Sequence, residues 1–275
     1  MNRLTALCVL IFLSILSSAK AQTTSPATTA SASGYSSLEQ AAIKGDQQAL
    51  RELQSDAGEG IADAQYHLGD FYLASRQYDQ AMFWFQRAAG NGSAPAENAI
   101  GDCYYNGLGV AKSIPAAADW YRKAANSGLA SAQLNLGAIY HDGIGVPQDY
   151  IQGVYWYVRA ADQGNAAAQN DLGFCYQHGQ GVTQDNQRAF TWYEKSAENN
   201  YPIGQYNLGS MYVAGVGTPQ DCKLAVYWFG KAANAGLADA AMALAGMYSR
   251  GLGVPEDSKK AEYWLAQAQK DGQKN

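Results

Sequence analysis

The chain has 275 residues and a formal net charge of -5 at pH 7, so it carries no long-range attraction for nucleic acid or an anionic membrane. Its length allows one large domain or two ordinary ones. Apolar residues make up 47% of the chain, and 19 Tyr and six Trp provide material for a sizeable core.

Residues 1–21 have the composition of a secretory signal peptide. Arg3 precedes an apolar run over residues 4–16, and the sequence AKA at 19–21 fits a cleavage site. The alternative is a retained membrane anchor, but the apolar run is too short to span a bilayer comfortably. We therefore expect an exported protein, periplasmic or secreted, with no stable membrane insertion after cleavage.

Two further segments precede the regular part of the chain. Residues 22–36 are rich in Ser, Thr and Ala and lack apolar periodicity. They cannot bury enough surface to offset the entropy lost on ordering, so we predict a disordered spacer. Residues 37–60 include LEQAAIKGDQQALRELQSDA, which is typical of a divergent helical pair. We expect this pair to form an N-terminal helical cap.

The rest of the chain repeats with a period of 36 residues. Three aromatic or aliphatic columns recur in every unit, and the first unit is four residues short between Tyr72 and Trp84. A fixed period of this size is the signature of a solenoid. The columns are Leu68, Ile100, Leu136, Leu172, Leu208 and Leu244; Tyr72, Tyr104, Tyr140, Tyr176, Tyr212 and Tyr248; and Trp84, Trp120, Trp156, Trp192, Trp228 and Trp264.

Each unit is predicted to contain two helices, as the third unit illustrates. Ala132, Leu136 and Tyr140 share one face of the first helix. Gly137 is a poor helix former, which indicates that the second helix approaches closely there. Asp149 is placed to cap the N-terminus of the second helix. The equivalent caps are Ser113, Asp185, Asp221 and Asp257.

The second helix carries an apolar stripe that includes Trp156, Tyr157 and Ala160 and is expected to face the core. A small residue always lies three positions before the Trp, as Gly153 does here, so we expect another helix to pass closely at this point. Glycines end both helices of the third unit, Gly143 the first and Gly164 the second, and Asn200 is the substitute at the second position in one unit.

These residues resemble the Sel-one-like repeat, a relative of the tetratricopeptide repeat. Its pattern, A-x-x-x-L-G-x-x-Y-x-x-G-x-G-V-x-x-D followed by K-A-x-x-W-Y-x-K-A-A-x-x-G, is met almost letter for letter over residues 132–164. The resemblance implies an all-α fold, a right-handed superhelical solenoid of helix-turn-helix repeats. The six repeats cover 61–272, with bounds 61–92, 93–128, 129–164, 165–200, 201–236 and 237–272.

The sequence departs from the repeat pattern at both ends. The first unit lacks the G-x-G loop, and Gln269 replaces an alanine in the last helix. Terminal repeats of a solenoid are expected to vary in this way, because each is covered on one side only.

The sequence offers no motif for catalysis or cofactor binding. The GLGV and GIGV loops lack the further residues of dinucleotide and phosphate loops, and they follow a helix rather than a strand. His67, His141 and His178 show no zinc-binding spacing, and His141 beside Asp142 is only a weak metal or acid/base candidate. We therefore predict no catalytic residue, no cofactor and no metal ligand.

Two other groups of residues are predicted to be structural. Cys103 and Cys175 lie two repeats apart, too far to bond, and with Cys222 they are interpreted as small hydrophobes. A basic column follows five of the six Trp residues by three positions, and we interpret it as a solvated face near the negative ends of helix dipoles. A stripe that binds an acidic partner is the alternative. The column consists of Arg87, Lys123, Arg159, Lys195 and Lys231.

One face of the first helices varies from unit to unit while the core columns do not. It holds the positions two before, two after and five after the repeated leucine. In superhelices of this kind the first helix lines the concave side, so we predict that this face binds a protein or peptide through exposed aromatics and amides. An unselected solvent-exposed face is the alternative. The candidate partner-binding residues are Tyr66, Asp70, Asn98, Asp102, Tyr105, His141, Asn170, Phe174, Gln177 and Tyr206.

The resemblance implies a non-enzymatic exported scaffold or adaptor that mediates protein–protein interaction, with no nucleic-acid partner. Two alternatives stay open. One is a periplasmic regulator of a membrane signalling or envelope-assembly complex. The other is a β-lactam-binding or hydrolysing enzyme like the cysteine-rich relatives, whose repeats each carry a cysteine pair that this chain lacks.

Overall fold

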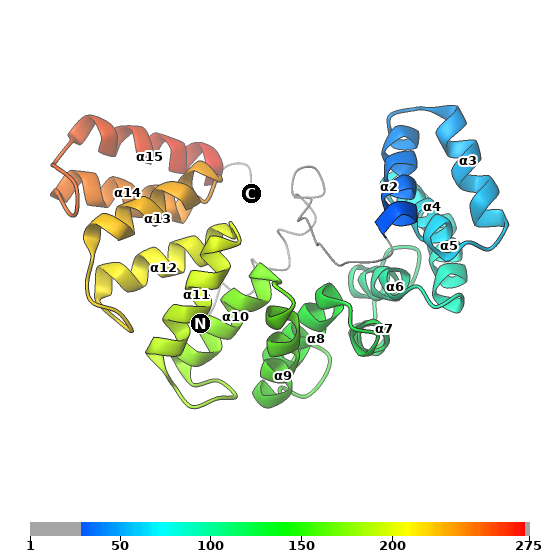
Figure 1. Ribbon diagram of the computed structural model, residues 1–275, viewed down its shortest axis with the longest axis horizontal. Coiled ribbons are helices and arrows are strands. Elements are labelled where there is room, and N and C mark those ends of the chain that lie inside the picture. Colours follow the sequence, from blue (N-terminus) through cyan, green and yellow to red (C-terminus); the bar gives the residue numbers. More distant parts are fainter. Residues whose placement is uncertain (1–28, 273–275) are drawn as a thin grey trace. The chain divides into compact units, whose positions relative to one another are not determined.

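The computed structural model describes residues 29–272, so the expected signal peptide lies outside the described residues. Fourteen helices and no strand occur within that range (Figure 1). None of these helices is both long and apolar enough to cross a membrane. The helices are α2 Thr29–Ile43, α3 Gln47–Gly58, α4 Ala62–Ala74, α5 Tyr78–Gly90, α6 Ala94–Asn106, α7 Ile114–Asn126, α8 Ala130–Asp142, α9 Tyr150–Asp162, α10 Ala166–His178, α11 Asn186–Glu198, α12 Pro202–Ala214, α13 Cys222–Asn234, α14 Ala238–Arg250 and α15 Ser258–Gly272.

The described residues form two compact units, 29–199 with α2 to α11 and 200–272 with α12 to α15. Within each unit the helices pack in consecutive pairs, and each of the six pairs from α4–α5 to α14–α15 corresponds to one period of the sequence. Successive pairs pack on one another within a unit, as α7 does on α8 and α13 on α14. The predicted all-α repeat solenoid is therefore confirmed.

The N-terminal helix starts earlier than the sequence suggests. α2 begins at Thr29, inside the segment predicted to be a disordered spacer over 22–36. The Tyr35 hydroxyl donates a 2.9 Å hydrogen bond to Asp56 Oδ2 on α3, and Tyr35 packs against the apolar cluster around Leu53. Tyr35 therefore attaches this end of α2 to α3, although the segment has the composition of a disordered one. α2 and α3 cover much of residues 37–60, where the sequence predicts an N-terminal helical cap.

The repeated glycine of the first helices marks a close contact, as predicted. A methyl group on Gly137 would lie 2.7 Å from Tyr157 Cδ1, and one on Gly101 would lie 2.5 Å from Tyr121 Cε1. Real carbon atoms do not approach so closely, so the glycine lets the aromatic ring of the second helix lie against the first helix. The equivalent rings are Phe85, Tyr193 and Phe229.

The predicted helix ends are confirmed. The Asp149 carboxylate accepts 3.0 Å hydrogen bonds from the backbone N–H groups of Ile151 and Gln152 at the start of α9. Ser113, Asp185, Asp221 and Asp257 make the same kind of bond. Gly143 ends α8 with φ +67°, and Asn200 reaches φ +59° in place of glycine. In the short first unit, Arg76 takes a left-handed conformation at φ +59° in the turn that lacks the G-x-G loop.

A column of buried amides joins successive helix pairs. Gln133 on α8 donates a 3.1 Å hydrogen bond to the Ala125 carbonyl at the end of α7. Its Oε1 accepts a 2.8 Å bond from Gln163 Nε2 at the end of α9. Gln65 with Asn91, and Gln169 with Asn199, repeat this arrangement. Each glutamine thus adds a second donor to a carbonyl at a helix C-terminus that otherwise accepts only from the backbone N–H groups of the turn that follows the helix.

The tryptophan column is less buried than its place in the apolar stripe suggests. Trp156 is 6% exposed, whereas the other five Trp side chains are half-buried. In the second helices from α5 to α13 the buried aromatic is instead the following residue, such as Tyr157 or Tyr193, whereas Leu265 at this position of α15 is exposed. The reason is geometric, since that residue fills the space left by the glycine of the first helix.

Candidate partner-binding face

The ten candidate residues lie on α4, α6, α8, α10 and α12, and none of them is fully exposed. We call the nine of them in the unit 29–199 the first-helix face. His141 is 7% exposed and Asn170 is 5% exposed, so the expectation that the face is open is wrong at these two positions. Side chains from neighbouring helices cover them, which the periodicity of one helix does not show. The other members are half-buried.

A hydrogen-bonded polar network runs from α6 to α8 on this face. Tyr121 donates a 2.6 Å hydrogen bond to Asp102 Oδ1, and Asn98 Nδ2 donates a 3.1 Å bond to Asp102 Oδ2. Asn135 Nδ2 on α8 donates in turn to Asn98 Oδ1 at 3.1 Å. Burial raises the pKa of the Asp102 carboxyl to about 6, although the Tyr121 hydrogen bond acts in the opposite direction. The network therefore fixes two amides and a carboxyl group in place.

A second polar group surrounds His141. Its Nδ1 lies 2.8 Å from Asp142 Oδ1 and its Nε2 lies 2.8 Å from Gln180 Oε1, just beyond α10. Burial acts to lower the pKa of His141, but the hydrogen bonds to Asp142 and Gln180 outweigh it and the pKa is raised. The Phe174 ring centroid lies 6.3 Å from that of His141. His141 thus positions its neighbours, and little of its surface is exposed for contact with a binding partner.

The remaining candidates are also held by neighbours. Gln177 Oε1 accepts a 2.8 Å hydrogen bond from the Tyr193 hydroxyl. Tyr66 donates a hydrogen bond to Asp70, whose pKa is raised to about 7 by burial and by the nearby Glu39. In the unit 200–272, the Tyr206 ring lies 5.6 Å from that of Phe229. Contacts within the chain therefore hold most of the candidate side chains in place in the absence of a binding partner.

The second helices carry the large exposed aromatics, which the sequence analysis did not single out. Phe83, Tyr155, Tyr227 and Tyr263 directly precede a tryptophan and are 45 to 55% exposed. The basic column lies over the tryptophans of five second helices, and its shortest contacts are Lys123 Nζ at 3.7 Å from the Trp120 ring centroid and Lys195 Nζ at 4.0 Å from that of Trp192. Such cation–π contacts hold the ammonium groups against the rings. An aromatic residue directly before Trp in four of the units is a sequence pattern from which these exposed side chains could have been predicted.

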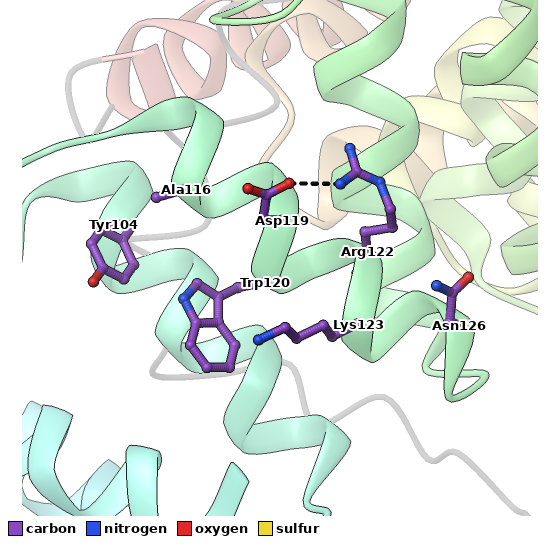
Figure 2. Close-up of a pocket in the computed structure, with 7 residues that line it drawn as sticks. All are labelled: Tyr104, Ala116, Asp119, Trp120, Arg122, Lys123 and Asn126. Atoms are coloured by element: carbon purple, nitrogen blue, oxygen red, sulfur yellow. Dashed lines mark hydrogen bonds and ion pairs between the residues drawn. The ribbon is translucent and has the colours of Figure 1, made fainter. Parts of the chain in front are cut away.

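A shallow hollow of about 490 Å³ lies beside one of these pairs (Figure 2). It is lined by Tyr104 from α6 and by residues of α7 that include Trp120 and Lys123. Asp119 and Arg122 in its lining form a 2.6 Å ion pair with each other, and Arg122 also donates to the Tyr140 hydroxyl. The two charges thus compensate each other and do not form an acid/base pair aimed at a substrate.

The three cysteines within residues 29–272 are free thiols, and two of them are buried as predicted. Cys103 and Cys175 are buried, and burial raises the pKa of each thiol to about 12. A thiol with such a pKa is protonated at neutral pH and is a poor nucleophile. Cys222 is half-buried at the start of α13.

Comparison with known protein families identifies six repeats, each of which corresponds to one helix pair. A family model of the Sel1 repeat matches residues 62–93, 94–129, 130–165, 166–201, 202–237 and 238–272. These six segments together cover most of the chain. No curated protein matches it.

Three solved structures illustrate the structural similarity. A protective antigen present in uropathogenic Escherichia coli strains, which displays an SLR fold, is 38% identical over 81% of this chain and 49% of its own, with a TM-score of 0.75. The present chain thus spans about half the length of that antigen. A Sel1 repeat protein from Oxalobacter formigenes is 33% identical over 74% of this chain and 84% of its own, with a TM-score of 0.68. An immunity protein from Pseudomonas aeruginosa is 19% identical over 75% and 82% of the two chains, with a TM-score of 0.53, and it shares the fold alone.

Proposed function

Because this chain belongs to the Sel1 repeat family, whose repeats are generally protein-interaction scaffolds, we propose that it is an exported, non-enzymatic scaffold. It binds a protein or peptide through the first-helix face of the unit 29–199. The export part of the proposal rests on the composition of residues 1–21.

The ordered polar network on the first-helix face carries the proposal. Asn98, Asp102 and Asn135 are linked by hydrogen bonds across α6 and α8, so their side chains are already ordered before a partner arrives. Ordering side chains is a main cost of association, and pre-ordered groups reduce it. Amide groups can donate to and accept from an extended peptide backbone. Half-buried Tyr105 and Phe174, also on the first-helix face, supply apolar contact area.

The chemistry of the chain also favours binding over catalysis. The thiols of Cys103 and Cys175 are buried and protonated, so they are poor nucleophiles. In the hollow of Figure 2, the charges of Asp119 and Arg122 neutralise each other in an ion pair. Hydrolysis of a chromogenic β-lactam by the purified protein would contradict the non-enzymatic part of the proposal.

The binding face can be tested with a photo-crosslinking amino acid at Tyr105 or Phe174, compared with one at Tyr155 on α9. Crosslinks in the native envelope identify the partner, and its affinity is then measured for purified variants. We expect Tyr105→Ala and Phe174→Ala to weaken binding by about 1–4 kcal/mol, the range for interface anchors, with little change in Tm. Tyr155→Ala is the matched control because it removes an exposed aromatic from a second helix.

The competing surface is the row of exposed aromatics and cations on the second helices. If Tyr155→Ala and Lys123→Ala abolish binding in a salt-sensitive manner while Tyr105→Ala and Phe174→Ala leave it intact, the first-helix face is not the binding surface. Salt sensitivity distinguishes the two surfaces because contacts of exposed lysines are screened by ions.

A further inference from the structure

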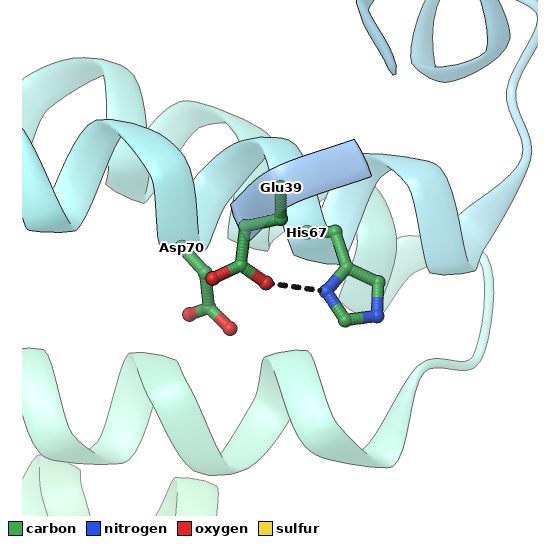
Figure 3. A group of neighbouring side chains, drawn as sticks. All are labelled: Glu39, His67 and Asp70. Atoms are coloured by element: carbon green, nitrogen blue, oxygen red, sulfur yellow. Dashed lines mark hydrogen bonds and ion pairs between the residues drawn. The ribbon is translucent and has the colours of Figure 1, made fainter. Parts of the chain in front are cut away.

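Three side chains with metal-binding groups meet where the N-terminal helix packs on the first repeat. Glu39 lies on α2, and His67 and Asp70 lie on α4 at a spacing of three residues (Figure 3). One ligand atom from each lies within 4.8 Å of the others. His67 Nδ1 and Glu39 Oε2 are 2.7 Å apart.

The cluster holds more negative charge than its protein neighbours compensate. The Glu39 and His67 side chains are 12% and 13% exposed. Within residues 29–272, no Lys or Arg forms an ion pair with Glu39 or Asp70, so the imidazole is the one basic group in contact. Two neighbouring carboxylates without a compensating cation repel each other. A bound cation would relieve this repulsion.

The donor atoms indicate which cation. An imidazole nitrogen with two carboxylate oxygens is a donor set typical of Zn²⁺ and related transition metals, whereas Ca²⁺ and Mg²⁺ prefer oxygen alone. We propose that Glu39, His67 and Asp70 bind a Zn²⁺ ion, with solvent at the fourth position. This site is independent of the proposed partner-binding function.

Surrounding residues support the orientation of the ligands. Tyr66 donates a hydrogen bond to Asp70, and its ring packs edge to face against His67 with 5.0 Å between centroids. Hydrogen bonds of this kind to a ligating carboxylate are typical of metal sites. The zinc ion would replace the proton between His67 Nδ1 and Glu39 Oε2, and these two atoms would separate to roughly 3.4 Å, as tetrahedral coordination with bonds of about 2.1 Å requires.

The proposed ion would connect α2 to α4. The same two helices are already in contact, and Tyr35 anchors α2 to α3. Zinc would therefore strengthen the attachment of the N-terminal cap to the first repeat, and binding would raise the Tm of the protein, because the ion binds the folded chain in preference to the unfolded one.

The test is a titration of the chelator-treated chain with Zn²⁺ by calorimetry, together with Tm measurements and visible absorption of the Co²⁺-substituted protein. We expect one equivalent of Zn²⁺, a higher Tm with the metal, and Co²⁺ absorption bands typical of nitrogen and oxygen ligands. Glu39→Gln and Asp70→Asn should each weaken binding by more than about tenfold, since they remove a ligand with little change in shape. His67→Ala should abolish it.

Matched controls distinguish this cluster from other metal-binding side chains. His178→Ala removes an exposed histidine and Cys222→Ser a half-buried thiol, and both should bind Zn²⁺ as the wild type does. Absence of any heat or Tm change in the wild type would overturn the proposal. Equal affinity for the wild type, Glu39→Gln and Asp70→Asn would overturn it too, even if His67→Ala fails to fold.

Discussion

Gly137 shows at the residue scale how a missing side chain controls the distance between two helices. Its α-carbon faces the ring of Tyr157, and the carbonyl of Gly137 in turn lies 3.2 Å from where a methyl group on Gly153 would be. Glycine costs about 1 kcal/mol relative to alanine within a helix. Glycine recurs at this position in four of the other units. This recurrence indicates that packing the aromatic ring of the second helix against the glycine, as Tyr157 packs against Gly137, stabilises the fold by more than glycine destabilises the helix.

The first prediction is that Gly137→Ala lowers the free energy of unfolding by about 1–3 kcal/mol, because the added methyl group overpacks against Tyr157. Gly230 is the matched control, since it also lies within a helix but a methyl group there would meet its nearest neighbour, Leu244, only at 4.0 Å. Gly230→Ala should be neutral or stabilising by up to about 1 kcal/mol. Urea denaturation of both variants measures the difference, and equal losses would show that overpacking against Tyr157 is not the cause of the loss at Gly137.

At the element scale, buried amides determine how one helix pair sits on the next. Gln133 accepts from Gln163 and donates to the Ala125 carbonyl, so one side chain connects α7, α8 and the end of α9. Apolar contacts tolerate small sliding movements, whereas a hydrogen bond depends on distance and angle. The amide column therefore specifies the register of neighbouring pairs in addition to stabilising them.

The second prediction concerns this column. Gln133→Ala should destabilise the protein by about 1–3 kcal/mol, because it leaves the buried carbonyl of Ala125 without its side-chain donor and removes the acceptor of Gln163. Gln152→Ala on the exposed side of α9 should change the free energy of unfolding by less than about 0.5 kcal/mol. Chemical denaturation tests both variants. A loss at Gln152 as large as that at Gln133 would contradict the role assigned to the column.

At the scale of the whole unit 29–199, buried carboxyl groups couple stability to pH. Burial raises the pKa of both Asp102 and Asp171 from 3.8 to about 6. The folded chain therefore binds protons more tightly at these positions than the unfolded chain does. The stability that this provides is fully present below about pH 4 and is lost as the pH rises through about 6.

The third prediction follows from that sign. Between about pH 4 and pH 6.5, the free energy of unfolding of the wild type should fall relative to that of the double variant Asp102→Asn, Asp171→Asn, which cannot ionise at these positions. One pKa unit corresponds to about 1.4 kcal/mol, so each group should contribute on the order of 2 kcal/mol or less to the difference. Denaturation at several pH values gives the two curves. Parallel curves would mean that the two carboxyl groups have ordinary pKa values in the folded chain.

The sequence by itself determined the repeat, the two helices of each unit and the residues that begin and end them. Asp149 lies within three residues of the backbone groups that it caps, and Gly143 directly follows the helix that it ends. The glycine column also predicted a close approach correctly. These features depend on neighbours along the chain and on a period that the chain itself displays, so local rules suffice for them.

Tertiary structure alone decided which side chains meet across helices and how much surface each retains. Glu39 and His67 are 28 residues apart, and Gln133 and Gln163 are 30 apart, so no local pattern connects them. His141 is on the predicted face but buried, because side chains such as Tyr150, Phe174 and Gln180 pack around it. Burial is a sum over all surrounding helices, whereas a sequence period reports the orientation of one helix only. For that reason the fold could be predicted from the sequence, and the exposed surface could not.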